Sequence, residues 1–575
     1  MHIPTLLKKV CCGKYCRLTD AVSGLYNGST EYVRENLGTI LNFIGGLNML
    51  RKKACLLLSA VMFICTAAGC GQKKEAAKYP SDGEIPKKLT IFANLGSHAK
   101  NAGAKSNNDI TSFKLMEKKT GCHVEWTHPA AGAETEKFNL MIASGNLPDM
   151  IVYEWSTVPG GAKMYYEDDM ILELGELIDK NMPNLKAFNT ERPEVKKQYT
   201  NDDGKIYYIP FIRKDKELKV FLGPQLRKDW LLKLQLNEPK TTDELREVLR
   251  AFKTQDPNGN GKADEIPMSG IGFKSVTQGI GNLCWAFGTH YDFYIDGDSV
   301  KYGILEQRFT EALDYISGLY DEGLIDKDFL LNDRSKMDAK VINNNVGFVY
   351  NYQPSNYYGT MNDGTRKIEG IEHLTGPHGD KKCYVPDYAN DVTKMAAAIT
   401  TANENPVGTA KWLDEFFGGK GLEYMNFGEE GKTFTWDNGY PRLTDNILHN
   451  PDGKDTVGML AKNISAYESQ FPTLQDWRYY EQSLSPWGRE AIDKWCNGTD
   501  TSGILPPLSF TAEENNTITQ IMSQVDTYVE ENINKIVVGN QAIESIDEIR
   551  TSIKKMGIDK VLKIYNDAYK RYKKR

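Results

Sequence analysis

The feature that most constrains this chain lies near residue 60, because it separates the part that can fold from a segment that cannot belong to a folded core. A basic triplet, Arg51–Lys53, precedes an apolar run of about fifteen residues, Ala54–Ala68, which ends at Gly69 and Cys70. This order is typical of a bacterial lipoprotein signal. The run is short for a bilayer span, and small residues lead directly to the cysteine, so the signal is favoured over a buried helix or a transmembrane anchor. We therefore expect Cys70 to carry a lipid such as palmitate and to hold an extracytoplasmic protein at the cell membrane.

This signal sets the first boundaries of the chain. Met49 is a natural start for it, so residues 1–48 are interpreted as an upstream extension outside the fold. Residues 49–69 form the signal peptide, and residues 70–86 form a polar tether between the lipid anchor and the folded body. Only the chain beyond the tether enters the prediction of the fold.

Charge and length restrict what the folded body can do. Residues 1–69 hold eight of the 70 Lys and Arg residues and three of the 77 Asp and Glu residues, which leaves a net charge of −12 on the remainder. Such an acidic body is not expected to bind nucleic acid. The remaining chain of about 505 residues exceeds the usual size of one hydrophobic core, so two domains are predicted.

The first part of the body alternates strands and helices. Strands are predicted at 88–94, 122–127 and 149–153, with helices at 111–119 and 136–144 between them. This alternation predicts a parallel sheet, and ligands of such sheets bind beyond the carboxyl ends of the strands. Residues 94–98 and 153–157 are therefore candidate binding loops.

A second α/β block follows. It starts near residues 203–210, continues with residues 226–236 and a predicted helix at 242–252, and has further predicted helices after Arg308. Later, residues 395–400 resemble a strand, residues 410–417 a helix, and the tail to Arg575 is mostly helical in pattern. The chain is thus expected to cross between two lobes more than once.

Several stretches together resemble a known family. They are SGNLPD at 144–149, DGKIYYIP at 203–210, RKDWLLKL at 227–234, EPKTTDELREVLRAF at 238–252, DPNGNGKADEIP at 256–267, LYDEGLIDKDF at 319–329, KWLDEFFGG at 411–419 and FGEEGKTFTWDNG at 427–439. They resemble the family 1 extracellular solute-binding lipoproteins of ABC importers, and most closely the LplA-like and alginate-binding branch that takes oligosaccharides. The resemblance runs from about residue 87 to the end of the chain.

The resemblance implies a fold and an activity. It implies an α/β, two-lobe, type II periplasmic-binding-protein fold with an interlobe ligand cleft and a hinge. We expect the N-terminal lobe at 87–200 plus roughly 376–430, and the C-terminal lobe at 201–375 plus roughly 431–575. The implied function is that of a monomeric, non-catalytic protein that captures a carbohydrate and delivers it to the permease subunits of an ABC transporter.

Residues 256–267 (DPNGNGKADEIP) form a candidate calcium loop. Side-chain oxygens recur at alternate positions, as hard cations require, and Gly261 allows a sharp turn. Pro267 stands where an EF-hand has its bidentate Glu, so Glu265 is expected to replace that ligand. The predicted structural calcium ligands are Asp256, Asn258, Asn260, the backbone carbonyl of Lys262, Asp264 and Glu265. The alternative is an Asx-rich turn that binds no metal.

Aromatic residues in loops are the candidates for a sugar site, because flat rings stack on pyranose faces. The predicted platforms are Trp155, Trp285, Tyr350, Tyr352 and Trp436, with Asp149 as a polar ligand. Arg227 is more simply explained by an ion pair with a neighbouring helix, and Trp230 and Trp412 by core packing.

Two other functions use the same features. A glycoside hydrolase needs two carboxylates, and Glu429–Glu430 and Glu167–Asp169 are the available clusters, but adjacent acids more often form a solvated face. The sequence has no Walker A loop and no HExxH, GxSxG or Rossmann glycine pattern, so catalysis is not expected. A lipoprotein of this fold could also present its ligand to a sensor, and the sequence does not separate sensing from import.

Overall fold

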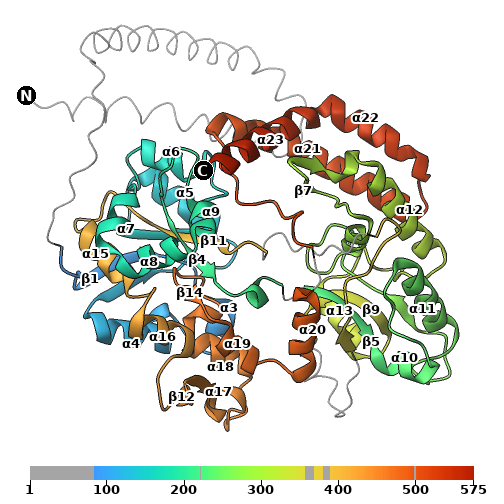
Figure 1. Ribbon diagram of the computed structural model, residues 1–575, viewed down its shortest axis with the longest axis horizontal. Helices are drawn as coiled ribbons and strands as arrows, with labels where there is room; N and C mark the ends of the chain where they lie inside the picture. The colour runs from blue at the N-terminus through green and yellow to red at the C-terminus, as the bar shows by residue number, and fades with distance from the viewer. Residues whose placement is uncertain (1–82, 221, 356–367, 380–388, 498–499) are drawn as a thin grey trace, which may run out of the picture. The chain divides into compact units, whose positions relative to one another are not determined.

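The computed structural model describes residues 83–575 except 221, 356–367, 380–388 and 498–499 (Figure 1). The predicted extension, signal peptide and lipidation site at Cys70 lie outside the described residues, as does most of the tether. In the described part, no helix is both long enough and apolar enough to cross a membrane.

The first sheet has six strands in the order β14-β4-β11-β3-β1-β2. β1 is parallel to β2 and β3, whereas β11 is antiparallel to β3 and β4. The bounds are β1 Lys88–Phe92, β2 His123–Thr127, β3 Met150–Tyr153, β4 Ile209–Arg213, β11 Val392–Ile399 and β14 Leu474–Gln475. The parallel sheet predicted from the strand–helix alternation is confirmed for β1, β2 and β3.

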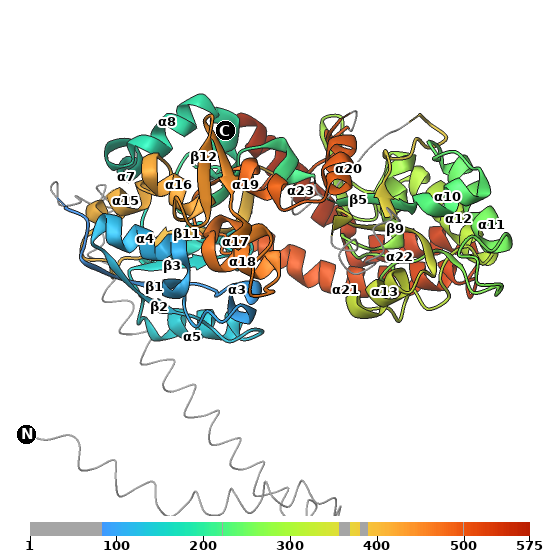
Figure 2. The same ribbon diagram turned by 90° about the horizontal axis from the view of Figure 1, so that it is seen from below.

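Helices cover both faces of this sheet, and successive strand residues divide between two apolar cores. Ile151 faces a core that contains Phe138 of α5, whereas Met150 and Val152 face the core beneath α4 and α15. Figure 2 shows α5 on one side of β1–β3 and α4 on the other. We call this sheet and its associated elements lobe 1. The associated elements are α3 Ser97–Asn101, α4 Thr111–Thr120, α5 Glu134–Ser144, α6 Gly161–Glu167, α7 Gly175–Asn181, α8 Pro183–Glu191, α9 Pro193–Tyr199, α15 Pro406–Asp414, α16 Gly419–Phe427, β12 Phe434–Asp437, β13 Tyr440–Leu443, α17 Asp445–Leu448, α18 Thr456–Asn463 and α19 Trp477–Gln482.

The second sheet has four strands in the order β10-β5-β9-β6. Its strands are β5 Leu222–Arg227, β6 Ile266–Met268, β9 Val346–Tyr352 and β10 Ile368–Gly370. We call this sheet and its associated elements lobe 2. They are α10 Lys228–Leu234, α11 Thr242–Thr254, the 3₁₀ helix η3 Ile280–Phe287, β7 Phe293–Asp296, β8 Ser299–Tyr302, α12 Gln307–Asp321, α13 Arg334–Ile342, α20 Pro486–Cys496, α21 Ala512–Val537, α22 Ile546–Met556 and α23 Ile558–Lys574. One apolar core includes residues of α11, α12, α21 and α22.

Local signals explain where several helices begin and end. Thr241 accepts a hydrogen bond from the backbone N–H of Glu244, whose side chain binds back to the Thr241 N–H, and this capping box starts α11. Gly121 ends α4 with a φ of 70°, a left-handed conformation that glycine adopts without strain. The predicted helix 111–119 and its glycine stop are therefore confirmed.

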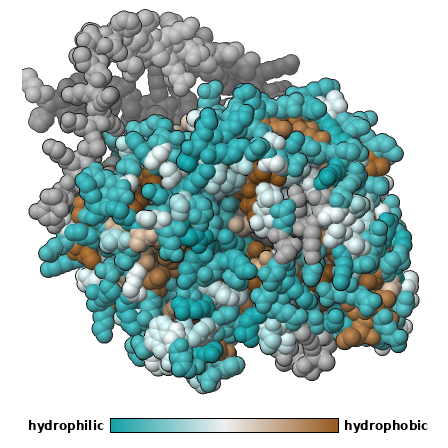
Figure 3. All heavy atoms as spheres, viewed as in Figure 1, coloured by the Kyte–Doolittle hydropathy of each residue, from teal (hydrophilic) through white to brown (hydrophobic). Residues whose placement is uncertain are grey.

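Two segments lie in a different lobe from the expected one. The expected boundaries put residues 201–213 and 431–485 in the second lobe, but β4 and β14 are strands of the six-stranded sheet. The reason is apolar burial, because Ile209, Ile212 and Leu474 join the core of lobe 1. Hydrophilic residues cover most of the face seen in Figure 3.

Candidate functional site

A cleft of about 1010 Å³ is lined by residues of both lobes. The lobe 1 wall comes from α3, the end of β4, α18, residues 466–475 and Tyr480 of α19. The lobe 2 wall comes from α13 and the end of β9, and the segments at 218 and 483–484 complete the lining. His98, in the loop predicted to follow the first strand, is one of the lining residues.

Aromatic side chains line the cleft in lobe 1. Phe211, Tyr467 and Tyr480 are lining residues, and the ring centroids of Tyr467 and Tyr480 lie 6.3 Å apart. Burial raises the pKa of both tyrosines, so their hydroxyls stay neutral at physiological pH. This wall therefore offers flat apolar surface together with hydroxyl groups.

The lobe 2 wall centres on Tyr352. The guanidinium of Arg334 lies 5.2 Å from the centroid of the Tyr352 ring, and Arg334 Nε donates to Asp338 Oδ2 at 2.7 Å. All three residues line the cleft, as does Gln353. This wall again combines an aromatic ring with hydrogen-bonding groups.

The acidic residues of the cleft have structural partners. Glu468 accepts hydrogen bonds from the backbone N–H groups of His98 at 2.9 Å and Ala99 at 3.0 Å, so it holds the start of α3. Asp455 caps α18 by accepting from the Gly458 N–H at 2.7 Å. Both carboxylates are thus held in fixed positions along the cleft.

The predicted platforms have different environments. Tyr352 lines the cleft, whereas Tyr350 is half-buried and packs against the core of lobe 2, with its ring 5.6 Å from that of Phe348. Trp436 is 42% exposed on the β12–β13 hairpin and is not among the residues that line the cleft.

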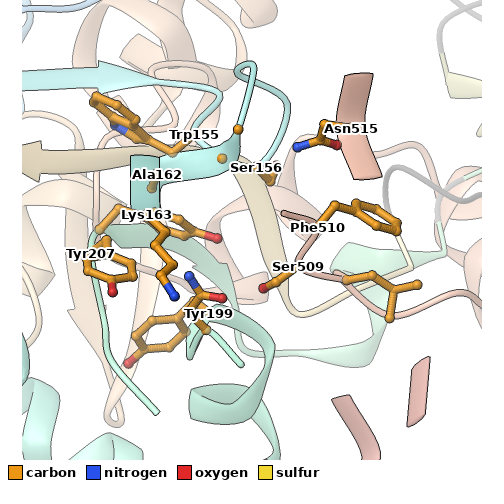
Figure 4. Close-up of a pocket in the computed structure, with 14 residues that line it drawn as sticks. Trp155, Ser156, Ala162, Lys163, Tyr199, Tyr207, Ser509, Phe510 and Asn515 are labelled. Atoms are coloured by element: carbon orange, nitrogen blue, oxygen red, sulfur yellow. The ribbon is translucent and has the colours of Figure 1, made fainter. Parts of the chain in front are cut away.

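Trp155 has no exposed surface, and its indole N–H donates to the Ile151 carbonyl at 3.2 Å. Its ring borders a separate hollow of about 40 Å³, which Figure 4 shows between Lys163, Tyr207 and Phe510. Small-molecule pockets usually measure about 300–1,000 Å³, so this hollow is too small for a sugar. In this conformation the Trp155 ring is a core element of lobe 1.

Trp285 and Asp149 also make structural contacts. Trp285 is 4% exposed in the buried helix η3 and stacks on His290, with ring centroids 4.5 Å apart. Asp149 Oδ2 accepts from the N–H and the hydroxyl of Thr90 at 2.7 and 2.8 Å, which ties β3 to β1. Neither residue lines the cleft.

The predictions of structural roles are confirmed. Arg227 is fully buried, and its Nε donates to Asp229 Oδ1 of α10 at 2.8 Å. Trp230 and Trp412 are each 1% exposed. Sequence analysis missed Tyr467, Glu468 and Tyr480, because the pattern around them predicts only a helical tail.

The candidate calcium loop, residues 256–267, folds as a tight turn held by its own side chains. Asp256 Oδ2 accepts from the Gly261 N–H at 3.1 Å, Asn260 Oδ1 accepts from the Lys262 N–H at 2.8 Å, and Gly259 and Gly261 both have a φ of 73°. The side-chain amides of Asn260 and Asn258 donate to Asp264, and these bonds lower its pKa. The oxygen-bearing side chains are therefore gathered in one turn.

Glu265 gives a further test of the fit to a metal. Its Oε1 is buried and has no hydrogen-bond partner, and burial raises the pKa of this carboxyl. A buried acceptor without a donor is rare, and a cation would satisfy it. The described residues hold no group of three or more His, Cys, Asp or Glu side chains arranged to bind a metal, so any site here depends on the Asn and backbone oxygens as well.

Comparison with known families decides the identity of the fold. The family model described as bacterial extracellular solute-binding protein matches residues 100–419, more than half of the chain. The chain belongs to this family. It therefore has the family's two-lobe, type II periplasmic-binding fold.

Relatives extend the match over almost the whole chain. The chain is 28% identical over 555 residues to the fructooligosaccharide ABC transporter substrate-binding protein FusA of Streptococcus pneumoniae, which covers 90% of this chain and 98% of FusA. Solved structures of FusA with kestose, and of a FusA EF-hand mutant with fructo-nystose, are each 26% identical with a TM-score of 0.67 and cover 84% of this chain and 99% of theirs. The alginate-binding protein AlgQ2, solved without calcium ion, is 27% identical with a TM-score of 0.66 and covers 86% of this chain and 100% of its own.

Proposed function

We propose that this protein is a lipid-anchored receptor that captures an oligosaccharide in the cleft and delivers it to an ABC permease without catalysing a reaction. The observation that carries the proposal is the cleft itself, because rings of both lobes line one cavity of about 1010 Å³. That volume lies at the upper end of small-molecule pockets, which suits more than one sugar ring. FusA, which matches over nearly its whole length, has been solved with kestose.

The side chains of the cleft have the chemistry that sugars need. Tyr352 from lobe 2 and Tyr467 and Tyr480 from lobe 1 supply flat faces for the C–H surfaces of pyranose or furanose rings. Gln353, Gln475 and the fixed carboxylates of Glu468 and Asp455 can exchange hydrogen bonds with sugar hydroxyls. Because these groups come from two lobes, a bound sugar would stabilise a closed arrangement, and the permease would recognise that state.

The lipid anchor and the lobe boundaries complete the proposal. Cys70 would carry the lipid, and the tether would hold the folded body outside the cell membrane. The lobes would comprise residues 87–213 and 391–485 for lobe 1, with the remainder in lobe 2, as the two sheets suggest. The protein would act as a monomer.

Residues 256–265 would hold a structural calcium ion. Its ligands would be Asp256, Asn258, Asn260, the Lys262 carbonyl, Asp264 and Glu265, all of them oxygen donors. When bound, the ion would cross-link the loop between α11 and β6. The buried, unpartnered Glu265 Oε1 supports this assignment, and the EF-hand described for FusA supports it from a relative.

The test is isothermal titration of the purified body with a panel of neutral oligosaccharides, including fructooligosaccharides, and of uronic-acid oligomers. Tyr352→Ala is compared with Trp436→Ala, because Tyr352 lines the cleft and Trp436 does not. We expect a member of the panel to bind, Tyr352→Ala to weaken it about tenfold or more, and Trp436→Ala to leave it unchanged. If only Trp436→Ala lost affinity, the sugar would bind at the β12–β13 hairpin and not in the cleft. Absence of binding by every carbohydrate of the panel would refute the proposal.

A further inference from the structure

Three buried amide side chains meet beneath the end of β9, next to the cleft. We call Gln225, Gln278 and Asn351 the amide cluster; they are 0%, 3% and 0% exposed. Gln225 Nε2 donates to the Asn351 carbonyl at 3.0 Å and also to the Tyr352 carbonyl. Asn351 Oδ1 accepts from the Tyr352 N–H at 2.8 Å and from Gln278 Nε2 at 3.0 Å. Side chains therefore hold the backbone at Asn351 and Tyr352 through both carbonyls and one N–H.

The amide cluster lowers the stability of the core in which it is buried. Gln225 Oε1 and Asn351 Nδ2 are buried and have no hydrogen-bond partner, so part of their desolvation is not compensated. An apolar core at these positions would avoid that cost. Buried polar networks of this kind lose stability but restrict a segment to one conformation.

The restricted segment is the one that reaches the cleft. Tyr352 and Gln353 line the cavity, and the Tyr352 ring also lies beneath the Arg334 guanidinium. β9 ends at Tyr352, and Asn351 and Tyr352 are its last two residues paired with β5. The amide cluster adds side-chain hydrogen bonds to these two residues, where the ladder has its end.

We propose that the amide cluster positions Tyr352 for the ligand, and that Gln278 and Gln225 are positioning residues for a platform they do not themselves form. The proposal rests on the proposed function, in which Tyr352 stacks on a sugar. A rigid platform loses less conformational entropy on binding than a mobile one, so the cluster would raise affinity without touching the ligand.

The variant that tests this role is Gln278→Met, which keeps the volume of the side chain and removes its bond to Asn351. A purely structural amide should change the melting temperature more than the affinity. A positioning amide should do the reverse, because Asn351 Oδ1 still accepts from the Tyr352 N–H in this variant, so the substitution does not leave this buried acceptor unsatisfied. We expect sugar affinity to fall about tenfold, while the melting temperature stays close to that of the wild type.

The matched control is Asn403→Leu. Asn403 is another buried amide that fixes a loop, since Asn403 Nδ2 donates to Thr409 Oγ1 at 2.9 Å and Asn403 Oδ1 accepts from the Asn405 N–H at 2.8 Å. It does not line the cleft. This variant should lower the melting temperature and leave the affinity unchanged.

Two measurements separate this inference from the proposed function. In a double-mutant cycle, Gln278→Met should have no further effect on affinity when Tyr352 is already Ala, because the amide acts through the ring. An equal loss in both backgrounds would overturn the inference. The second measurement needs no ligand: 3-fluorotyrosine at position 352 should give one narrow ¹⁹F resonance in the wild type and a broadened or split one in Gln278→Met. An unchanged resonance would overturn the inference that the amide cluster positions Tyr352. Absence of sugar binding by the wild type would overturn only the proposed function.

Discussion

The carboxylate of Asp202 in lobe 1 pairs with the guanidinium of Arg575 in lobe 2, with Arg575 Nη2 2.6 Å from Asp202 Oδ1. The Nε of Arg571 lies 2.7 Å from the other oxygen, Oδ2, so one carboxylate binds two arginines. Arg571 also pairs with Glu514 of α21 at 2.8 Å. The side chain of Arg575 is only 3% exposed, which makes this a mostly buried contact between the lobes.

Asp202→Asn should lower the free energy of unfolding by about 2 kcal/mol, because it leaves two guanidinium groups facing a neutral amide. Urea denaturation at low and high salt is the measurement, and the loss should shrink as salt screens the pair. Asp298→Asn is the control. This substitution removes the 3.1 Å pair of Asp298 with Lys573, which lies on α23 as Arg571 does. Asp298, however, is 97% exposed and belongs to lobe 2. An equal loss of unfolding free energy in both variants would mean that the contact between the lobes stabilises the protein no more than an exposed surface pair does.

His290 should make the protein sensitive to acid. Burial, together with the charge of Lys274, lowers the pKa of His290 to about 3. The folded protein therefore binds fewer protons than the unfolded chain, in which the pKa is about 6.5. This contribution to stability is complete above pH 6.5 and is lost as the pH falls toward 3, by about 3 kcal/mol at pH 4.

The measurement is thermal or urea unfolding of the wild type and of His290→Gln between pH 7.5 and 4. The variant changes packing against Trp285 at every pH, so the comparison is the slope of stability against pH and not its absolute value. The slope should be shallower in His290→Gln. Parallel curves would mean that His290 does not titrate as its burial requires.

Elements with local signals could be predicted from the sequence. The strands β1, β2 and β3 and the helices between them follow from periodicity, and α4 ends at Gly121 because a left-handed glycine closes it. The lobe that a later segment joins has no such signal. β14 has two residues and lies far along the chain from its partner β4, so only tertiary packing places it.

The residues of the cleft, like β14, could not be brought together from local sequence signals. Its walls combine His98, Phe211 and Tyr352 with residues 466–484, and no local pattern relates positions so far apart. Trp285 is predicted as a platform in a loop, but the glycines that flank it allow close packing of a buried helix. A Cβ on Gly281 would lie 2.7 Å from the Phe273 carbonyl oxygen. A tryptophan between glycines is therefore as consistent with a tight core as with an exposed platform.

The same close packing predicts the effect of a methyl group in β5. A Cβ on Gly223 would lie 2.3 Å from Cε2 of Trp495, whose indole N–H is fixed by a bond to the Ile371 carbonyl at 2.9 Å. Gly223→Ala should cost about 1–3 kcal/mol in unfolding free energy because the ring has to move. Gly503→Ala is the control, since its Cβ would meet atoms only at 3.5 Å and beyond. Equal unfolding free energies of the two variants would show that the Trp495 ring can move aside without a loss of stability.

Glu265 should make the stability of the proposed calcium loop depend on pH. Burial raises the pKa of Glu265, and the charges of Asp256 and Asp264 raise it further. In chelator the folded protein therefore binds the proton more tightly than the unfolded chain. Stability from this group is present in acid and is lost as the pH rises from about 4.3 through the raised pKa. Bound calcium would remove this loss, because the cation stabilises the carboxylate.

Glu265→Gln should consequently shift the melting temperature in opposite directions under two conditions. In chelator at pH 7.5 the variant should melt higher than the wild type, because a buried charge without a partner has been removed. In calcium it should melt lower, because a ligand is missing and a wild type saturated at one hundred times its dissociation constant gains about 2.7 kcal/mol. Glu247→Gln, on the exposed face of α11, should show no dependence on calcium. A shift of the same sign with and without calcium would remove Glu265 from the ligand set and leave the loop an Asx-rich turn.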